Sequence, residues 1–271
     1  MFSSFMINAW AVATLVAVVA GIVGFFVVLR GSSFAAHALP LGTFPGAAAA
    51  NLLGINPLFG LILFAVLGVA GISQLGRRSR HEVATALSLV TLLGLGTLFL
   101  SLTREYSQGV YALLFGEVLG ISRAEIVPVA VTSIVASGVT LLLFRPLLLS
   151  AISPELGEAR GISARRMELW FLALLAFATA TALPIVGALL VFSLMVGPAA
   201  AARAMTNRPI PAMLLSVGIS LLTVWVAISL SYLSNWPVGF FVGAIGAFSY
   251  AIGRIWGQFG TMRLRRDVVL S

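Results

Sequence analysis

The chain has 271 residues, of which 60% are hydrophobic and only 9% are charged, and its mean hydropathy is +1.10. A soluble domain carries charge on about 25% of its residues, so most of this surface must face lipid or other apolar protein. The net charge of +8 comes from arginine alone, and the absence of cysteine excludes disulfides, thiolate metal sites and cysteine nucleophiles. Because the arginines stand at the ends of apolar stretches, the basic charge indicates membrane topology rather than nucleic-acid binding.

The apolar stretches predict an all-α polytopic membrane protein with about nine transmembrane helices. A helix needs about 20 apolar residues to cross a bilayer, and it satisfies its own backbone there. Runs closed by Arg, Pro or Gly clusters give Ile7–Leu29, Leu41–Leu53, Leu58–Leu75, Val83–Leu102, Ile126–Phe144, Leu169–Leu183, Ile185–Met205, Met213–Leu233 and Val238–Trp256. The second is short for a full crossing. The first is too long for a signal peptide and lacks a basic region before it, so we expect it to remain in the mature protein.

The arginines also predict the orientation, because Arg-rich flanks stay in the cytoplasm. With the N-terminus outside and the C-terminus inside, fourteen arginines lie inside and two, Arg104 and Arg123, lie outside. Residues from about 257 to 271 then form a basic cytoplasmic tail. We expect one transmembrane domain over residues 1–271, with no second soluble domain.

A polar segment with two prolines precedes and enters the second predicted span. Between Gly31 and Gly46, Pro40 and Pro45 each remove a helix hydrogen bond, which predicts a broken helix. Irregular backbone at membrane depth survives only when it is buried or lines a water-filled path. His37 is therefore either a ligand or path residue, or a silent side chain near the cytoplasmic headgroups.

The segment from Thr103 to Glu125 is predicted to lie outside the membrane. Tyr106–Leu119 is apolar but too short to cross, and Glu117 and Glu125 make the segment amphipathic. We expect one or two short helices that lie on the outer surface or dip back into the membrane.

A short cytoplasmic helix is predicted at about residues 153–161. Ser153 is a suitable N-cap, Pro154 suits the first helical position, Glu155 lies in the first turn, and Gly161 is a C-terminal stop. Glu158 lies on the same helix. The helix is either an ordinary loop helix at a membrane surface or the contact through which a cytoplasmic motor acts on a permease.

The sixth and seventh spans are separated by little more than Pro184, so the chain must turn tightly there or begin a broken helix. From Pro184 to Arg203 the chain carries many small residues, which permit close helix approach, and Pro198 is expected to kink the span. Simple helix packing accounts for most of this pattern, and a moving interface is the functional alternative.

Enzymatic chemistry has little support. The two histidines, His37 and His81, are far apart, and no His-x-x-x-His or Glu-x-x-His spacing occurs. With no lysine, the chain cannot supply a phosphate-binding P-loop, so any ATP would be hydrolysed by a partner. The chain is expected to be a transport protein and not an enzyme.

The sequence resembles the membrane permease subunit of metal-type ABC importers, the zinc/manganese/iron family, from about Phe26 to Gly253. The resemblance lies in the order and spacing of Phe26-Val-Val-Leu-Arg30, Tyr111-Ala-Leu-Leu-Phe-Gly-Glu-Val-Leu119, Ser153-Pro-Glu-Leu156 with Gly161, and Val186-Gly-Ala-Leu-Leu190 leading into Pro198-Ala-Ala-Ala-Ala-Arg203. It implies a bacterial multi-pass plasma-membrane protein that works as a permease pair, either a homodimer, which is favoured, or a pseudo-symmetric pair. It also implies two cytoplasmic ABC ATPase subunits, which would dock on the Ser153–Gly161 helix, and an extracytoplasmic substrate-binding protein.

The resemblance further implies a metal path near His37, Pro40, Pro45 and Gly46. Family members carry an Asp-Ala-Leu-x-His run shortly before Leu-Pro-Gly, and that Asp and His are the expected metal contacts. Anchoring the register on Phe44-Pro45-Gly46 puts His37 at the Asp position and Leu41 at the His position. Two symmetry-related His37 residues suit zinc better than manganese, which prefers carboxylates.

Three functions therefore remain open. The first is an ABC permease for a divalent metal, with zinc favoured over manganese or iron and no permanently bound cofactor. The second is the same machinery with another cargo, such as a metal chelate. The third is a secondary transporter without an ATPase, against which the scarcity of intramembrane charge counts.

Overall fold

The computed structural model describes residues 4–76, 81–102 and 123–269. All the regular elements of these residues are helices: α1 (Ser4–Leu29), α2 (Ser33–Leu52), α3 (Pro57–Leu75), α4 (His81–Ser101), α6 (Arg123–Leu142), α7 (Phe144–Ile152), α8 (Pro154–Ala159), α9 (Ala164–Val186), α10 (Ala188–Met205), α11 (Pro209–Ser234) and α12 (Val238–Val269). The predicted all-α class is confirmed. The expected outer helices between Thr103 and Glu125 fall almost entirely outside the described residues.

Five helices of the described chain are long and apolar enough to cross a membrane: α1, α3, α4, α11 and α12. A sixth crossing results if α6 and α7, which meet at an angle of 57°, form one bent span. α2, α9 and α10 do not meet the same length and hydropathy criteria, so the predicted count of about nine stays a prediction. The protein is nonetheless a multi-pass helical bundle.

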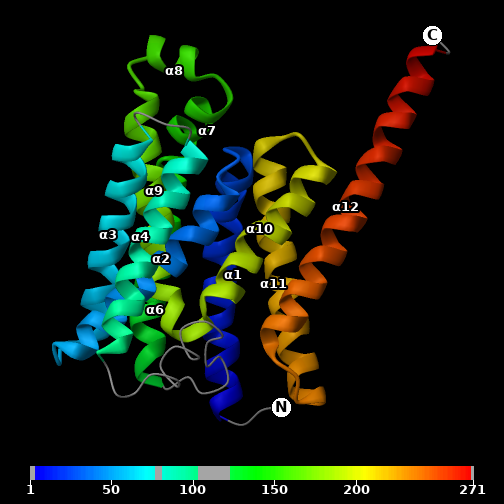
Figure 1. The fold of residues 1–271 in the computed structure, drawn as a ribbon. Helices are drawn as coiled ribbons and strands as arrows, with labels where there is room; N and C mark the ends of the chain where they lie inside the picture. The colour runs from blue at the N-terminus through cyan, green and yellow to red at the C-terminus, as the bar shows by residue number, and fades with distance from the viewer. Residues whose placement is uncertain (1–3, 77–80, 103–122, 270–271) are drawn as a thin grey trace.

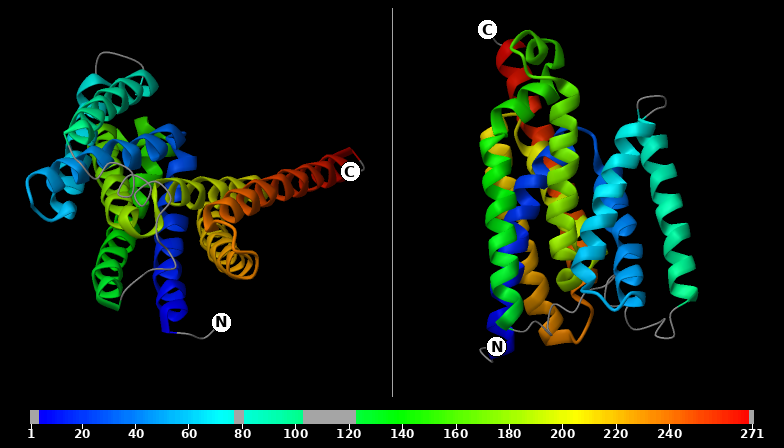
Figure 2. Two further views of the ribbon diagram at one scale, coloured as in Figure 1. Left: turned by 60° about the horizontal axis from the view of Figure 1, so that its bottom comes forward. Right: turned by 90° about the vertical axis from the view of Figure 1, so that its left-hand side faces the viewer.

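The long helices run alternately up and down, so that the chain starts at one end of the bundle and finishes at the other (Figure 1). The end that holds α7 and α8 is called here the α8 end. α4 and α12 stand on opposite flanks, with α1 between them (Figures 1 and 2). α12 continues beyond Trp256 to Val269, so it includes most of the residues of the predicted basic tail, whose cytoplasmic location stays a prediction.

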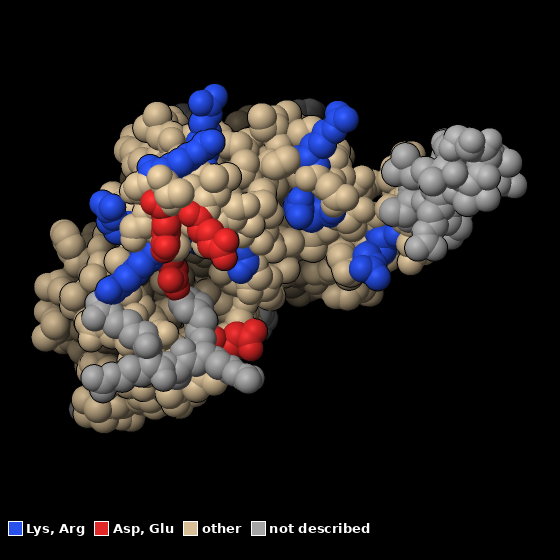
Figure 3. Space-filling model, turned by 90° about the horizontal axis from the view of Figure 1, so that it is seen from above, with Lys and Arg blue, Asp and Glu red and all other residues tan. Residues whose placement is uncertain are grey.

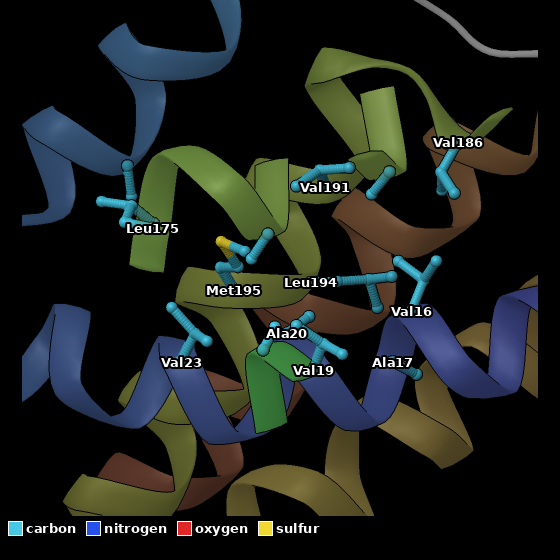
Figure 4. Packing of buried hydrophobic residues seen from close by; sticks show 14 of the residues in the cluster. Val16, Ala17, Val19, Ala20, Val23, Leu175, Val186, Val191, Leu194 and Met195 are labelled. Atoms are coloured by element: carbon cyan, nitrogen blue, oxygen red, sulfur yellow. The ribbon is translucent and has the colours of Figure 1, made fainter. Parts of the chain in front are cut away.

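α1 is the central helix of the core. It is apolar on all sides, and 72% of its spanning window is buried, as expected for a helix surrounded by other helices. Figure 4 shows its small and branched side chains meeting Val191, Leu194 and Met195 of α10 and Leu175 of α9. α11 covers another face of α1, where Ser216 donates a hydrogen bond to the Gly21 carbonyl oxygen at 2.8 Å.

The prediction of a broken, late-starting second span was wrong. α2 begins at Ser33, not at Leu41, and continues through both Pro40 and Pro45. Both prolines are buried, and the Thr43 hydroxyl donates to the Pro40 carbonyl oxygen at 2.8 Å. Close packing against α3 and α4 therefore holds a helix that its local sequence disfavours.

Two other boundaries differ from, or refine, the prediction. The fifth span ends at Leu142, and α7 leaves at an angle after Leu143 instead of extending the span. α9 passes through Pro184, and the chain reverses at Gly187, whose φ of +79° favours glycine. The predicted tight turn between the sixth and seventh spans is thus confirmed, one turn later than Pro184.

Charged side chains of both signs gather at the α8 end, which Figure 3 shows from above. Helix ends and short connections place these described arginines there: Arg30, Arg145, Arg160, Arg165, Arg166, Arg203 and Arg208. Most of the described arginines thus lie at one end of the bundle axis, while the orientation of that end in the membrane stays a prediction.

Candidate functional site

α8 is a single short helix with well-defined ends. Ser153 occupies the N-cap position and Pro154 the first helical position, although the Ser153 hydroxyl makes no capping bond within the described chain. At the other end Gly161, with φ of +77°, donates to Glu158, and Ile162 donates to Gly157, both at 2.9 Å. This pair of bonds is a Schellman motif, so the predicted stop at Gly161 is confirmed.

α8 lies at the extreme of the bundle, above α7 and the start of α9 (Figure 1). Gly157 is its buried residue and packs near Leu149 and Ser150 of α7. Pro154, Glu155, Leu156 and Glu158 are exposed. The helix therefore presents an acidic surface with one large apolar side chain, Leu156, to whatever adjoins this end.

A cavity of about 700 Å³ opens beside α8. Its wall is formed by the α1–α2 turn, the ends of α3 and α4 that face α8, and parts of α7, α8 and α9. Three carboxylates, on Glu82, Glu158 and Glu168, and two guanidinium groups, on Arg30 and Arg165, line it together with apolar and hydroxyl side chains. The cavity thus lies at the α8 end of the bundle, and its lining is polar and carries charges of both signs.

Arg30 closes the inner side of this cavity. One terminal nitrogen, Nη2, donates to the Leu147 carbonyl oxygen at 3.2 Å and to the Ser150 hydroxyl, both on α7. The guanidinium carbon lies 5.2 Å from the centre of the Phe171 ring on α9, a cation–π distance. Burial lowers the pKa of Arg30 and the charge of Glu168 raises it in part, but an arginine stays protonated in proteins.

His37 lies on the face of α2 that meets α10. Its ring contacts the Phe192 ring edge to face, with centroids 4.7 Å apart, and the side chain is half-buried. Leu41, one turn further along the same face, is also half-buried. His37 therefore stays accessible in part from outside the chain.

Pro45 and Gly46 lie on the side of α2 that meets α3 and α4. A Cβ on Gly96 of α4 would stand 2.7 Å from the Pro45 ring, and Gly46 meets Gly60 of α3 backbone to backbone. Pro40 is also buried. The structure thus gives Pro45 and Gly46 a packing role on a different face from His37.

No group of three His, Asp or Glu side chains that could hold a metal occurs among the described residues. His37 is separate from the carboxylates of the cavity. One chain on its own therefore supplies a single imidazole, near the start of α2, which is too few ligands for a closed metal site.

Sequence reasoning missed the contacts of Arg30 and the cavity. Arg30 was used only for topology and for the family resemblance, yet it follows a mostly apolar helix and precedes Gly31, where φ of +65° turns the chain sharply. An arginine at such a turn is the signal that could have indicated a buried partner.

The described residues form an apolar helical bundle of a multi-pass membrane protein, with a short helix, α8, projecting at its charged end. The chain belongs to the ABC 3 transport family, whose model matches residues 2–256. It is a multi-pass plasma-membrane transport subunit and not an enzyme.

Named relatives are similar over most of their length. The manganese import system permease protein ScaB of Streptococcus parasanguinis is 30% identical over 237 residues, 87% of this chain and 84% of the relative. The high-affinity zinc uptake system membrane protein ZnuB of Buchnera aphidicola is 27% identical over 254 residues, 92% of this chain and 97% of the relative. The solved structure of PsaBC from Streptococcus pneumoniae in complex with Fab shares the fold, with a TM-score of 0.83 and 24% identity, over 93% of this chain and 91% of that one.

Proposed function

We propose that the chain forms the transmembrane path of an ABC importer for a divalent metal ion, driven by a separate cytoplasmic ATPase. The observation that carries this proposal is α8, a capped helix that projects from the charged end with Glu155, Leu156 and Glu158 exposed. A projecting helix held firmly on the bundle can transmit movement from a docked motor. Family membership supports the same role.

The proposal includes an orientation with the N-terminus outside, the C-terminus in the cytoplasm and about nine crossings. It rests on the arginines of the α8 end, because basic flanks stay in the cytoplasm. In this orientation the ATPase reaches α8. A substrate-binding protein would deliver the cargo at the opposite end, and lipid would cover the exposed apolar flanks.

The metal path is proposed to require a second copy of the chain. His37 and Leu41 are half-buried on one face of α2, and a single imidazole cannot hold an ion. Two His37 side chains meeting across a homodimer would double the ligand number. Pro40, Pro45 and Gly46 shape α2 beside this path through packing.

The helical start of α2 suggests another register for the expected Asp–His pair. Anchored on Leu39-Pro40, the pattern puts His37 at the His position and Ser33 at the Asp position. Ser33 then lies one turn before His37 on the same face, in the first turn of α2. This register keeps the imidazole ligand and replaces the carboxylate by a hydroxyl.

The cargo is proposed to be zinc or manganese. Imidazole without a carboxylate favours zinc. Relatives are named for both metals, so neither is preferred on that ground. A metal chelate remains the second candidate, since the chain lacks the carboxylate of the expected pair.

Uptake by purified components tests the proposal. The chain would be co-expressed with its partner ATPase and reconstituted in vesicles with the matching binding protein. Uptake of radioactive zinc or manganese should require ATP and fall strongly in His37→Ala. Glu155→Arg should weaken binding of the ATPase, whereas Ser234→Arg, at the opposite end, should not.

Three outcomes separate the alternatives. Uptake of the metal only when a chelator is supplied would favour the chelate. Uptake without any ATPase would identify a secondary transporter. ATP-dependent uptake of neither metal nor chelate would refute an importer of this cargo class.

A further inference from the structure

Arg30 joins three parts of the chain that are far apart in sequence. It follows α1, donates to Leu147 and Ser150 on α7, and lies over Phe171 on α9. Its Nε has no hydrogen-bond partner among the described residues. Arg30 is half-buried, and its contacts with α7 and α9 offset the cost of taking part of its charge out of water. This residue therefore favours one arrangement of α1, α7 and α9.

An aromatic cluster strengthens the same contact between α1 and α7. The Phe144 ring, at the start of α7, lies 6.4 Å from that of Phe25 and 5.6 Å from that of Phe26, measured between centroids. Phe25 and Phe26 are fully buried. The last turn of α1 is therefore packed against one face of α7.

The contacts continue in both directions from Arg30. Toward α8, Gly157 is buried against α7, and only Ser153 separates the two helices. Toward α2, the turn at Gly31 is closed by bonds from Gly31 to Val28 at 3.2 Å and from Ser32 to Val27 at 2.9 Å. An unbroken series of packed elements thus leads from α8 to the helix that carries His37.

We propose that Arg30 is a positioning residue, which holds the α1–α2 turn and the α7–α8 pair together as one body. Movement of α8 would then shift the start of α2 and change the position of the His37 side chain. This inference rests on the proposed function, because it gives α8 the role of docking site. It adds the residue that transmits movement of the docked helix α8 to α2, beside the proposed metal path.

The contact suits arginine better than lysine. The guanidinium donates to two acceptors on α7 while its carbon lies 5.2 Å from the centre of the Phe171 ring. A lysine ammonium is a more compact and more strongly hydrated charge on a flexible stem, so it should hold these contacts less firmly. Arg30→Lys should therefore hold α1, α7 and α9 together less firmly than the natural arginine but more firmly than Arg30→Gln.

Spin-label distances test the single-body arrangement. The natural chain has no cysteine, so Phe34→Cys on α2 and Ala159→Cys on α8 place two labels at exposed positions without background. With Arg30 intact, the distance distribution should be narrow and unchanged between the nucleotide-free and ATP-bound complexes. In Arg30→Gln it should broaden, and in the matched control Arg208→Gln, on the exposed α10–α11 turn, it should not.

Transport efficiency gives the second measurement. In reconstituted vesicles, Arg30→Gln should bind the ATPase and hydrolyse ATP, yet metal imported per ATP should fall about tenfold, as expected for a broken coupling element. Arg30→Lys should give an intermediate value. A residue that only stabilises the fold would lower uptake and hydrolysis in the same proportion.

The result that overturns the inference is a label distance that changes with nucleotide in the chain with Arg30 intact. An unchanged distribution and an unchanged import per ATP in Arg30→Gln would overturn it too. If Arg30→Gln does not fold, Ser150→Ala removes one acceptor and takes its place in both measurements. Failure of the proposed function gives a different result. If vesicles with the unsubstituted permease import no metal, the label distances still show whether α2 and α8 move as one body.

Discussion

Gly46 of α2 and Gly60 of α3 meet backbone to backbone, so that a Cβ on either residue would overlap the carbonyl oxygen of the other. We expect Gly46→Ala to force α2 and α3 apart and to destabilise the protein by about 1–3 kcal/mol. The thermal unfolding temperature in detergent would fall accordingly.

The matched control is Gly94→Ala on α4, because no described atom lies within 4 Å of the Cβ added there. Alanine in an open helical position is expected to stabilise by up to about 1 kcal/mol relative to glycine. Equal unfolding temperatures for the two variants would contradict the close crossing.

Gly161→Ala is expected to weaken docking of the ATPase. The residue has φ of +77°, and an L side chain in that conformation costs about 1–2 kcal/mol, which favours unwinding of the end of α8. Affinity for the ATPase should fall about tenfold, the equivalent of 1.4 kcal/mol.

Gly54→Ala is the control for this loss of affinity. Gly54 has φ of +66° and open surroundings, but it lies between α2 and α3 at the opposite end of the bundle. It should carry a similar local strain and leave affinity for the ATPase unchanged. A similar loss of affinity in both variants would indicate general destabilisation.

α8 and α2 show where sequence reasoning succeeded and where it failed. The ends of α8 depend on Pro154 and Gly161, which act within a few residues, so local rules sufficed. In α2 the local rule predicted a break at Pro40, but packing of Gly46 and Pro45 against α3 and α4 outweighed it.

The contacts of Arg30 were beyond prediction for a different reason. Leu147 and Ser150 are 117 and 120 residues from Arg30 along the chain. No local sequence pattern predicts that α1 and α7 will be in contact. The apolar character of α1 was evident, whereas the partners of its terminal charge depend on the assembled bundle.

The metal preference should change with the ligand beside His37. Ser33→Asp adds a carboxylate one turn before His37, in the first turn of α2, where a negative charge is favoured. A carboxylate suits manganese, so uptake should shift from zinc toward manganese. Competition between the two metals during uptake measures the shift.

Leu41→His tests the other register, anchored on Phe44-Pro45-Gly46. If that register holds, this variant restores the missing imidazole, and affinity for the metal should rise while Ser33→Asp has little effect. The opposite pattern would support Ser33 as the lost carboxylate position.

Hydroxyl groups on α11 should differ in their effect on stability. Ser216 donates to Gly21 across the α1–α11 contact, so Ser216→Ala should destabilise by about 0.6 kcal/mol, the average for such bonds in membranes. The buried Thr223 hydroxyl has no partner among the described residues, so Thr223→Val should be neutral or stabilising. Denaturant unfolding in detergent would compare the two, and a larger loss for Thr223→Val would contradict this assignment.

The gathering of arginines at the α8 end gives the molecule an electrical polarity along the membrane normal. Each basic side chain near an anionic leaflet is attracted by about 1 kcal/mol. The carboxylates of the same end, on Glu82, Glu155, Glu158 and Glu168, offset part of this attraction, but the described arginines there outnumber them. A bilayer with unequal leaflet charge therefore favours one insertion direction of this protein.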